Sequence, residues 1–210
     1  MEERTRIKDL QKQLAAQGWG GALIAYSRNI LYYTGTAQPA WLVVLPDDYM
    51  LYVRSGMDFA CREVFIPPEK VQEERRLEKI AASLQAKLPP GGGRIGIETD
   101  ILNAAQYLAI GELFRGYTFA NVSPLLLAQR QIKDVEEVAL LREACRTIHA
   151  GHEAVLATLR AGVTELELAA AVENAHRLAG HEGVFFIRQP DFFMSRGPIG
   201  SGPNLLRNSG

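Results

Sequence analysis

The second half of the chain contains the side chains best suited to bind a metal ion. His149 and His152 are one helical turn apart, a spacing at which two imidazoles can hold zinc. His152 and Glu153 also match the start of the His-Glu-x-x-His motif of zinc peptidases, but the second histidine of that motif is absent. Because His152 falls on the apolar stripe of a predicted helix, we expect a packed, hydrogen-bonded histidine rather than a ligand.

Other spacings that could carry chemistry are incomplete. Glu173-Asn-Ala-His176 has the Glu-x-x-His spacing of di-iron bundles, which need a second copy and further glutamates that the sequence lacks. Ser201 is not set in a Gly-x-Ser-x-Gly motif, which argues against a serine nucleophile. Pro89–Gly93 lacks the Gly-Lys-Ser/Thr of a phosphate-binding loop, so we expect a connector there. We therefore expect the chain to bind no catalytic metal.

The bulk composition is that of an ordinary globular protein. Of the 210 residues, 47% are hydrophobic and 22% are charged. The formal net charge of −1 gives no electrostatic basis for binding nucleic acid or an anionic membrane. The first residues are too charged for a signal peptide, and the apolar runs fall far short of the about 18 residues of a membrane span. With Cys61 and Cys145 expected to be reduced and buried, we predict a cytoplasmic protein with neither nucleic acid nor membrane as a partner.

Helices and strands alternate in the first half of the chain. The apolar spacing predicts helices over 3–17, 29–35, 58–64, 76–88 and 103–114, and strands over 22–26, 40–45, 49–54, 94–98 and 119–122. Pro46-Asp47-Asp48 joins two of these strands as a hairpin turn, so the sheet should be mixed rather than wholly parallel. We expect an α/β domain with a mixed sheet and flanking helices over residues 1–128.

The second half changes to long helices. Asp134 with Glu137, and Thr164 with Glu167, have the spacing of capping boxes, which predicts helices over 134–160 and 165–178. A turn this short between them should pack the two helices together through their apolar stripes. The aromatic segments 184–188 and 192–196 follow as strands of a new sheet. Residues 129–210 are therefore expected to be an α+β domain that begins with a helical hairpin and remains incomplete.

Three segments in this order resemble the family of creatinase, prolidase and Xaa-Pro aminopeptidase, the pita-bread metallopeptidases. They are Asn29-Ile-Leu-Tyr-Tyr-Thr-Gly35, Ile132-Lys-Asp-Val-Glu-Glu-Val-Ala-Leu-Leu-Arg-Glu-Ala144 and Leu159-Arg-Ala-Gly-Val-Thr-Glu-Leu-Glu-Leu168. The resemblance implies a creatinase-type N-terminal domain with a six-stranded mixed sheet, followed by the start of the pita-bread domain.

The resemblance also implies a parent enzyme that hydrolyses the peptide bond before proline, with two divalent metal ions (Mn, Co or Zn). The family's metal ligands lie beyond Ser201-Gly-Pro-Asn204, so this chain should hold no catalytic residue and no metal ligand, and should be inactive alone. Ser201, Gly202 and Asn204 correspond to the family's Ser-Gly-x-Asn, and we assign them to substrate binding. In dimers of the family, the loop that contains Thr36, Gln38 and Pro39 reaches toward the partner's active site, which implies a homodimer; the alternative for this loop is an ordinary solvated connection.

One departure from the family pattern leaves an alternative open. The family usually has a substrate-binding histidine about seven residues after the glycine of Ser-Gly-x-Asn, whereas this chain ends in Arg207-Asn-Ser-Gly210. The alternative is a pita-bread homologue without catalysis, which acts as a peptide- or protein-binding or dimerisation module.

Overall fold

The chain divides into two compact units. The computed structural model describes residues 5–89, 92–183, 185–188, 193–194 and 199–206. Its units are residues 1–132 and 133–210. The boundary predicted after residue 128 falls inside the last helix of the first unit, Ser123–Gln131.

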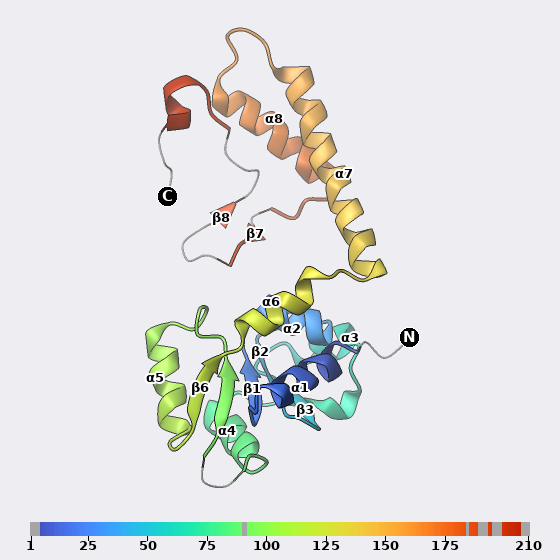
Figure 1. Ribbon diagram of the computed structural model, residues 1–210. Coiled ribbons are helices and arrows are strands. Elements are labelled where there is room, and N and C mark those ends of the chain that lie inside the picture. The colour runs from blue at the N-terminus through green and yellow to red at the C-terminus, as the bar shows by residue number, and fades with distance from the viewer. Residues whose placement is uncertain (1–4, 90–91, 184, 189–192, 195–198, 207–210) are drawn as a thin grey trace. The chain divides into compact units, whose positions relative to one another are not determined.

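The first unit is built on a six-stranded mixed sheet in the order β4-β3-β2-β1-β5-β6 (Figure 1). β1 pairs antiparallel with β2 and β2 with β3, while the β1–β5, β3–β4 and β5–β6 pairs are parallel. The predicted hairpin is confirmed, because Val44 lies opposite Tyr49 and the Leu45 amide donates to the Asp48 carbonyl at 2.8 Å. The strands are β1 Gly21–Ile24, β2 Ala40–Val44, β3 Tyr49–Val53, β4 Val71–Glu73, β5 Arg94–Ile97 and β6 Thr118–Asn121.

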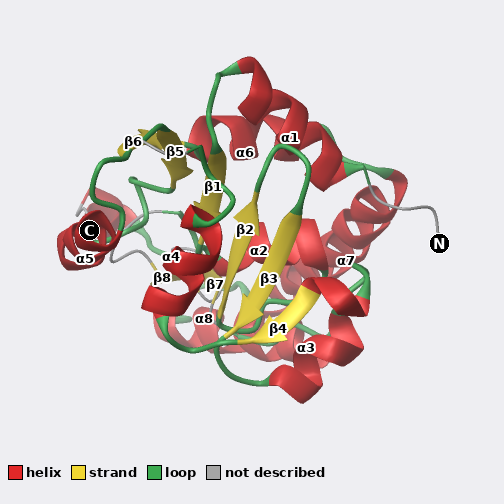
Figure 2. Ribbon diagram, turned by 90° about the horizontal axis from the view of Figure 1, so that it is seen from below, coloured by secondary structure: helices red, strands yellow, loops and turns green. Residues whose placement is uncertain are grey.

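Helices cover both faces of this sheet (Figure 2). Successive side chains of a strand point to opposite faces. Accordingly, Ala22 and Ile24 belong to one core with the helices α1 Arg6–Ala16, α2 Ser27–Thr34, α3 Met57–Glu63 and α6 Ser123–Gln131. Leu23 belongs to the other core, with α4 Leu77–Gln85 and α5 Ala104–Leu113. The sheet is thus buried between two layers of helices.

Two elements of the first unit differ from the sequence predictions. β4 follows a short 3-10 helix, Pro68–Lys70, in a stretch for which no strand was predicted. α6 fills the stretch that was expected to end the domain, and Pro124 sits in its first turn, where its missing N–H costs no hydrogen bond.

Cys61 and Cys145 are free thiols as expected, but both are exposed, so the prediction that they are buried is wrong.

The backbone conformation at Gly35 explains why the first family-like segment ends in glycine. It ends α2 with a φ of 94°, in the left-handed region that favours glycine. A Cβ added there would also lie 2.7 Å from the Glu63 carbonyl oxygen, closer than atoms normally approach. The glycine that ends this segment is therefore required by the turn.

The second unit begins with two packed helices, α7 Val135–Thr158 and α8 Glu165–Leu178. Both predicted capping boxes are confirmed: Asp134 bonds with Glu137, and Thr164 with Glu167. The contact uses a different face of α7 from the predicted stripe. Gly151 is buried against the His176 ring of α8, and a Cβ at Gly151 would collide with that ring.

The apolar stripe predicted to pack against α8 is largely exposed. Leu141 is 52% exposed, Ile148 66% and Leu159 61%. His152 lies on the same stripe and is also exposed, so the prediction of a packed histidine is wrong. The helices were correctly predicted, but not the side on which they meet.

The rest of the second unit consists of short elements. β7 Phe185–Phe186 and β8 Phe193–Met194 pair antiparallel, and a 3-10 helix spans Gly202–Leu206. The predicted strands 184–188 and 192–196 thus have paired cores, while residues 184, 192, 195 and 196 lie outside the described residues. Within the described ranges, no helix has the length and apolar character needed to cross a membrane.

Candidate functional site

Two of the three predicted substrate-binding residues, Ser201 and Asn204, bind one carboxylate of the second unit. The Glu165 Oε1 atom accepts a hydrogen bond from the Ser201 amide at 2.5 Å and another from the Ser201 hydroxyl at 2.7 Å. The other oxygen, Oε2, accepts from the Asn204 side-chain amide at 2.9 Å. These hydrogen bonds lower the pKa of Glu165, with the Ser201 hydroxyl as the largest cause and Asn204 as the next. Ser201 and Asn204 are thus brought together, and Glu165 is a partner that sequence reasoning missed.

Local sequence explains how these groups are positioned. Thr164 is the N-cap of α8 and exchanges hydrogen bonds with Glu167, which places Glu165 at the first helical position. A negative side chain is favoured at a helix N-terminus. On the other side, Gly202 has a φ of 49°, and the chain turns so that the Asn204 amide reaches the Ser201 carbonyl at 3.2 Å. Ser201, Gly202 and Asn204 are all exposed.

The predicted partner-site loop is firmly attached to the first unit. The Thr36 side chain is buried, and its hydroxyl donates to the Glu63 carboxylate at 2.5 Å while accepting from the Gln38 amide at 3.2 Å. Gln38 packs over Gly56, where an added Cβ would lie 2.6 Å from the Gln38 Oε1 atom. Pro39 is exposed, and its carbonyl accepts from the Arg54 amide at 2.8 Å. The buried Thr36 side chain therefore anchors the loop to α3, and Pro39 is part of its exposed tip.

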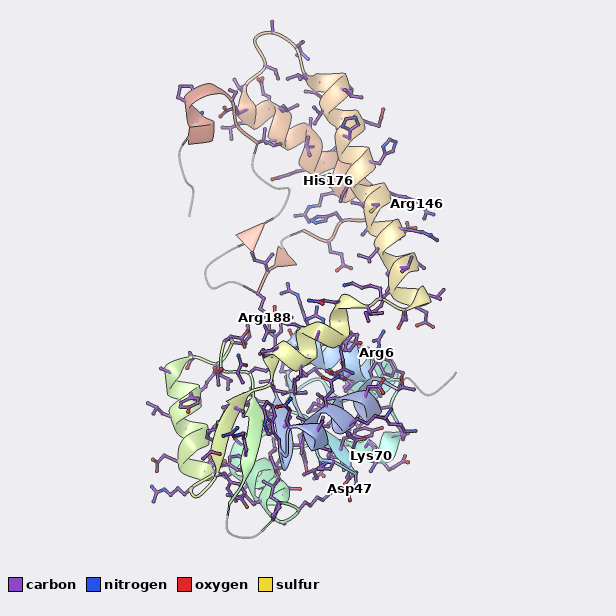
Figure 3. The ribbon with its side chains drawn as sticks, in the orientation of Figure 1. Arg6, Asp47, Lys70, Arg146, His176 and Arg188 are labelled. Atoms are coloured by element: carbon purple, nitrogen blue, oxygen red, sulfur yellow. The ribbon has the colours of Figure 1, made fainter. Side chains whose placement is uncertain are left out.

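No metal centre forms among the residues that the structure describes. They contain no group of three or more His, Cys, Asp or Glu side chains that could hold an ion. His149 lies 3.8 Å from Glu153 on the surface of α7, and the His176 and His181 rings have centroids 6.0 Å apart (Figure 3 labels His176). The His181 Nδ1 atom accepts from the Gly183 amide at 3.1 Å. The donors present thus do not fit a two-metal centre.

A buried polar cluster in the first unit was not predicted from the sequence. The fully buried Glu98 accepts from the backbone amides of Ala25 and Tyr26 at 2.7 and 2.8 Å, and from the Asn29 side chain at 2.5 Å. Arg130 donates to the Asn29 side-chain oxygen at 2.9 Å. Asn29 opens the first family-like segment, and its role here is to join α2 to the end of β5 and to α6. The sequence contains one hint of this cluster: Glu98 is a charged residue that directly follows the apolar strand β5.

A second polar connection closes the same face of the first unit. The Tyr33 hydroxyl donates to the Gln129 side-chain oxygen, and the Gln129 Nε2 atom donates to the Arg6 carbonyl at 3.0 Å. Burial raises the pKa of Tyr33 well above its ordinary value. The Arg6 guanidinium, labelled in Figure 3, in turn lies 4.0 Å from the centroid of the Tyr32 ring. Helices α1, α2 and α6 are thereby tied to one another.

A small cavity of about 170 Å³ opens near the β2–β3 turn of the first unit. Asp47 and Lys70, labelled in Figure 3, are among its lining residues. Its polar groups serve the turn: Lys70 bonds to Asp48 at 2.6 Å, and Gln11 donates to the carbonyls of Leu45 and Asp48 at 2.8 and 3.1 Å. We assign the cavity no catalytic role.

Comparison with known proteins covers nearly the whole chain. Residues 6–132 match the model of the creatinase/prolidase N-terminal domain, and residues 139–204 match that of metallopeptidase family M24. The "Putative dipeptidase YkvY" of Bacillus subtilis is 26% identical over 190 residues, which are 86% of this chain and 52% of that protein. The creatinase of a Bacillus species is 24% identical over 178 residues, which are 80% of this chain and 43% of that protein.

The fold is also similar to solved structures. An Xaa-Pro dipeptidase from Bacillus anthracis superposes with a TM-score of 0.74 at 19% identity, over 86% of this chain and 50% of that one. At this identity the likeness shows the fold alone. The chain spans about half the length of these three proteins.

Proposed function

Because the chain belongs to the creatinase/prolidase family, we propose that it is the N-terminal portion of a hydrolase that cleaves the peptide bond before a proline. Two family models together match residues 6–132 and 139–204. The coverage of about half of the Bacillus subtilis and Bacillus anthracis proteins supports a portion rather than the whole enzyme. The single observation that carries the proposal is the order of the two matches along one chain.

We propose that this chain supplies substrate contacts, while the downstream half of the family's fold supplies the metal ligands. Two divalent ions, Mn, Co or Zn, would activate a water molecule and polarise the scissile carbonyl. Since no group of metal-binding side chains forms in the described part of this chain, their ligands would come from downstream residues. Ser201, Gly202 and Asn204 would contact the peptide, and the tip at Pro39 would reach a partner's active site in a cytoplasmic homodimer.

Hydrolysis of an Xaa-Pro dipeptide tests the proposal. We expect activity from a protein that extends this chain to the length of its relatives, supplied with Mn, Co or Zn, and none from the 210-residue chain. After dialysis, elemental analysis should find no stoichiometric metal in the 210-residue chain. Activity or tightly bound metal in that chain would contradict the proposal that the metal ligands lie downstream. An extended protein that binds proline-containing peptides without cleaving them would support a non-catalytic binding module instead.

A further inference from the structure

Hydrogen bonds join the Ser201–Asn204 segment to the first turn of α8. In the described part of the chain, every hydrogen bond that residues 199–206 make with another element ends on Glu165. We propose that Glu165 is a positioning residue, which fixes the segment that contacts the substrate without touching the substrate itself. The substrate side of this inference rests on the proposed function; the attachment itself does not.

The number and direction of the donors require a carboxylate. Ser201 donates twice to Oε1, and Asn204 donates to Oε2, so both oxygens of Glu165 act as acceptors. An ionised carboxylate accepts at both oxygens, whereas an amide has one acceptor oxygen and a donor NH2 group. In Glu165→Gln, the NH2 group would therefore face either the Ser201 donors or the Asn204 donor. The substitution keeps size and shape but must break one side of the attachment.

The position of Glu165 is itself well determined. It occupies the first turn of α8, which starts at the capping box of Thr164 and Glu167. Ala169 and Val172 are buried further along the helix, and the His176 ring packs on Gly151 of α7. The carboxylate is thus carried by a helix whose start and packing are fixed, while its target is a short exposed turn. A rigid element of this kind can hold a binding segment in one arrangement.

Glu167 provides a matched control on the same helical turn. Its Oε2 atom alone accepts from both the Thr164 amide and the Thr164 hydroxyl, each at 2.8 Å. The single carbonyl oxygen of a glutamine can take over both bonds. Glu167→Gln therefore removes the same charge from the same turn as Glu165→Gln, but preserves the hydrogen bonds. A difference between the two variants reports the attachment and not the loss of a negative charge.

Amide hydrogen exchange of the 210-residue chain, resolved by NMR, tests the attachment directly. In Glu165→Gln we expect the Ser201 amide to exchange about tenfold faster than in the wild type, because its charged acceptor is replaced either by the NH2 group or by a neutral oxygen. Its proton resonance should also move upfield. The amides of Ala169 and Val172 should keep their protection, which shows that α8 is intact. In Glu167→Gln all of these amides should exchange as in the wild type.

Two results would overturn the proposal at this stage. One is an unchanged Ser201 amide together with an unchanged Asn204 side-chain amide in Glu165→Gln, since one of the two sides must lose its acceptor. The other is equal acceleration in Glu165→Gln and Glu167→Gln, which would assign the effect to the helix start. Neither result bears on the proposed function, because no substrate is involved.

Kinetics of the extended protein then test the positioning role. We expect Glu165→Gln to raise KM for an Xaa-Pro dipeptide about tenfold with a smaller change in kcat, since a misplaced binding segment loses substrate contacts. Glu167→Gln should leave both constants unchanged. Unchanged kinetics in Glu165→Gln would refute the role even if exchange is accelerated. An inactive wild type would refute the proposed function and leave the exchange result standing.

Discussion

Two glutamates show how the two units differ. Glu98 in the first unit and Glu165 in the second each accept hydrogen bonds from backbone and side-chain donors. Glu98 is fully buried, so its donors have no water to replace it if it is removed. The partners of Glu165 are exposed, and water can take its place. The same arrangement therefore stabilises a fold in one unit and selects a local conformation in the other.

The apolar side chains show the same contrast. In the first unit they form two cores, one on each face of the sheet. Among the described residues of the second unit, the buried apolar side chains are Ala169 and Val172. Larger ones stay accessible, with Leu140 71% exposed, Leu166 78% and Leu178 83%. The first unit thus contains its own core, while the described part of the second leaves most of its apolar surface open.

The largest expected effect is on the stability of the first unit when the chain is cut at two nearby positions. We expect a fragment of residues 1–132 to unfold cooperatively, and a fragment of residues 1–128 to be destabilised by roughly 3–5 kcal/mol. The shorter fragment lacks Gln129 and Arg130, which leaves Tyr33, the Arg6 carbonyl and Asn29 without these partners. Urea unfolding followed by near-ultraviolet circular dichroism measures both. Equal stability would show that the end of α6 adds nothing; failure of both would show that the first unit needs the second.

Removing the two glutamates sharpens the contrast within the intact chain. We expect Glu98→Ala to cost about 4 kcal/mol of unfolding free energy, because two backbone amides and the Asn29 side chain lose their acceptor in a buried site. Glu165→Ala should leave the unfolding midpoint of the first unit unchanged. Chemical denaturation of the two variants measures the difference. A small effect of Glu98→Ala would mean that water enters the cluster.

The open apolar surface of the second unit should cause association. Leu141 and Ile148 lie on the exposed stripe of α7. We expect the wild-type chain to show a concentration-dependent mass above 23.2 kDa in light scattering, and Leu141→Lys/Ile148→Lys to weaken association about tenfold. Leu31→Lys/Leu108→Lys, a matched pair of exposed sites in the first unit, is the control. A wild-type chain that stays monomeric at all concentrations would contradict this expectation.

The smallest effect concerns the hairpin turn of the first unit. Hydrogen bonds from Lys70 and then Lys87 hold the pKa of Asp48 well below its usual range. A lowered folded-state pKa stabilises the protein above the unfolded pKa of about 3.9, and this stability is lost as the pH falls toward the folded value. We expect Asp48→Asn to cost about 1 kcal/mol at pH 7, since the pair is partly exposed to solvent. The difference from wild type should shrink below about pH 4; a constant difference would exclude the ion pairs as its source.

Local signals predicted much of the fold. The capping pairs Asp134 with Glu137 and Thr164 with Glu167 placed the starts of α7 and α8, because a capping box is complete within one helical turn. The Pro46–Asp48 turn predicted the β2–β3 hairpin for the same reason. Where a few neighbouring residues determine an element, the sequence was sufficient.

Features that depend on distant partners were missed. β4 is a three-residue strand that exists because it pairs with β3, and nothing in Val71–Glu73 alone indicates it. The face of α7 that packs on α8 was misjudged, because a small residue, Gly151, allowed closer approach than the larger apolar stripe. The Glu165–Ser201 contact joins residues 36 positions apart, and the sequence gives no signal for it. The residues of the candidate site were predicted from a family motif, but not the side chain that holds them.

The contact between Gln129 and the Arg6 carbonyl has a consequence for the order of events during protein synthesis. It joins positions 123 residues apart, so the first and last helices of this unit meet only after nearly all of it has been made. A growing chain leaves the ribosome from its N-terminus, and domains generally fold as units in that order. Until α6 has been synthesised, helix α1 therefore lacks this partner. The part of its apolar face (Ile7, Leu10 and Leu14) that packs toward α6 stays uncovered during that time. During that interval the unit presents apolar surface of the kind that chaperones bind.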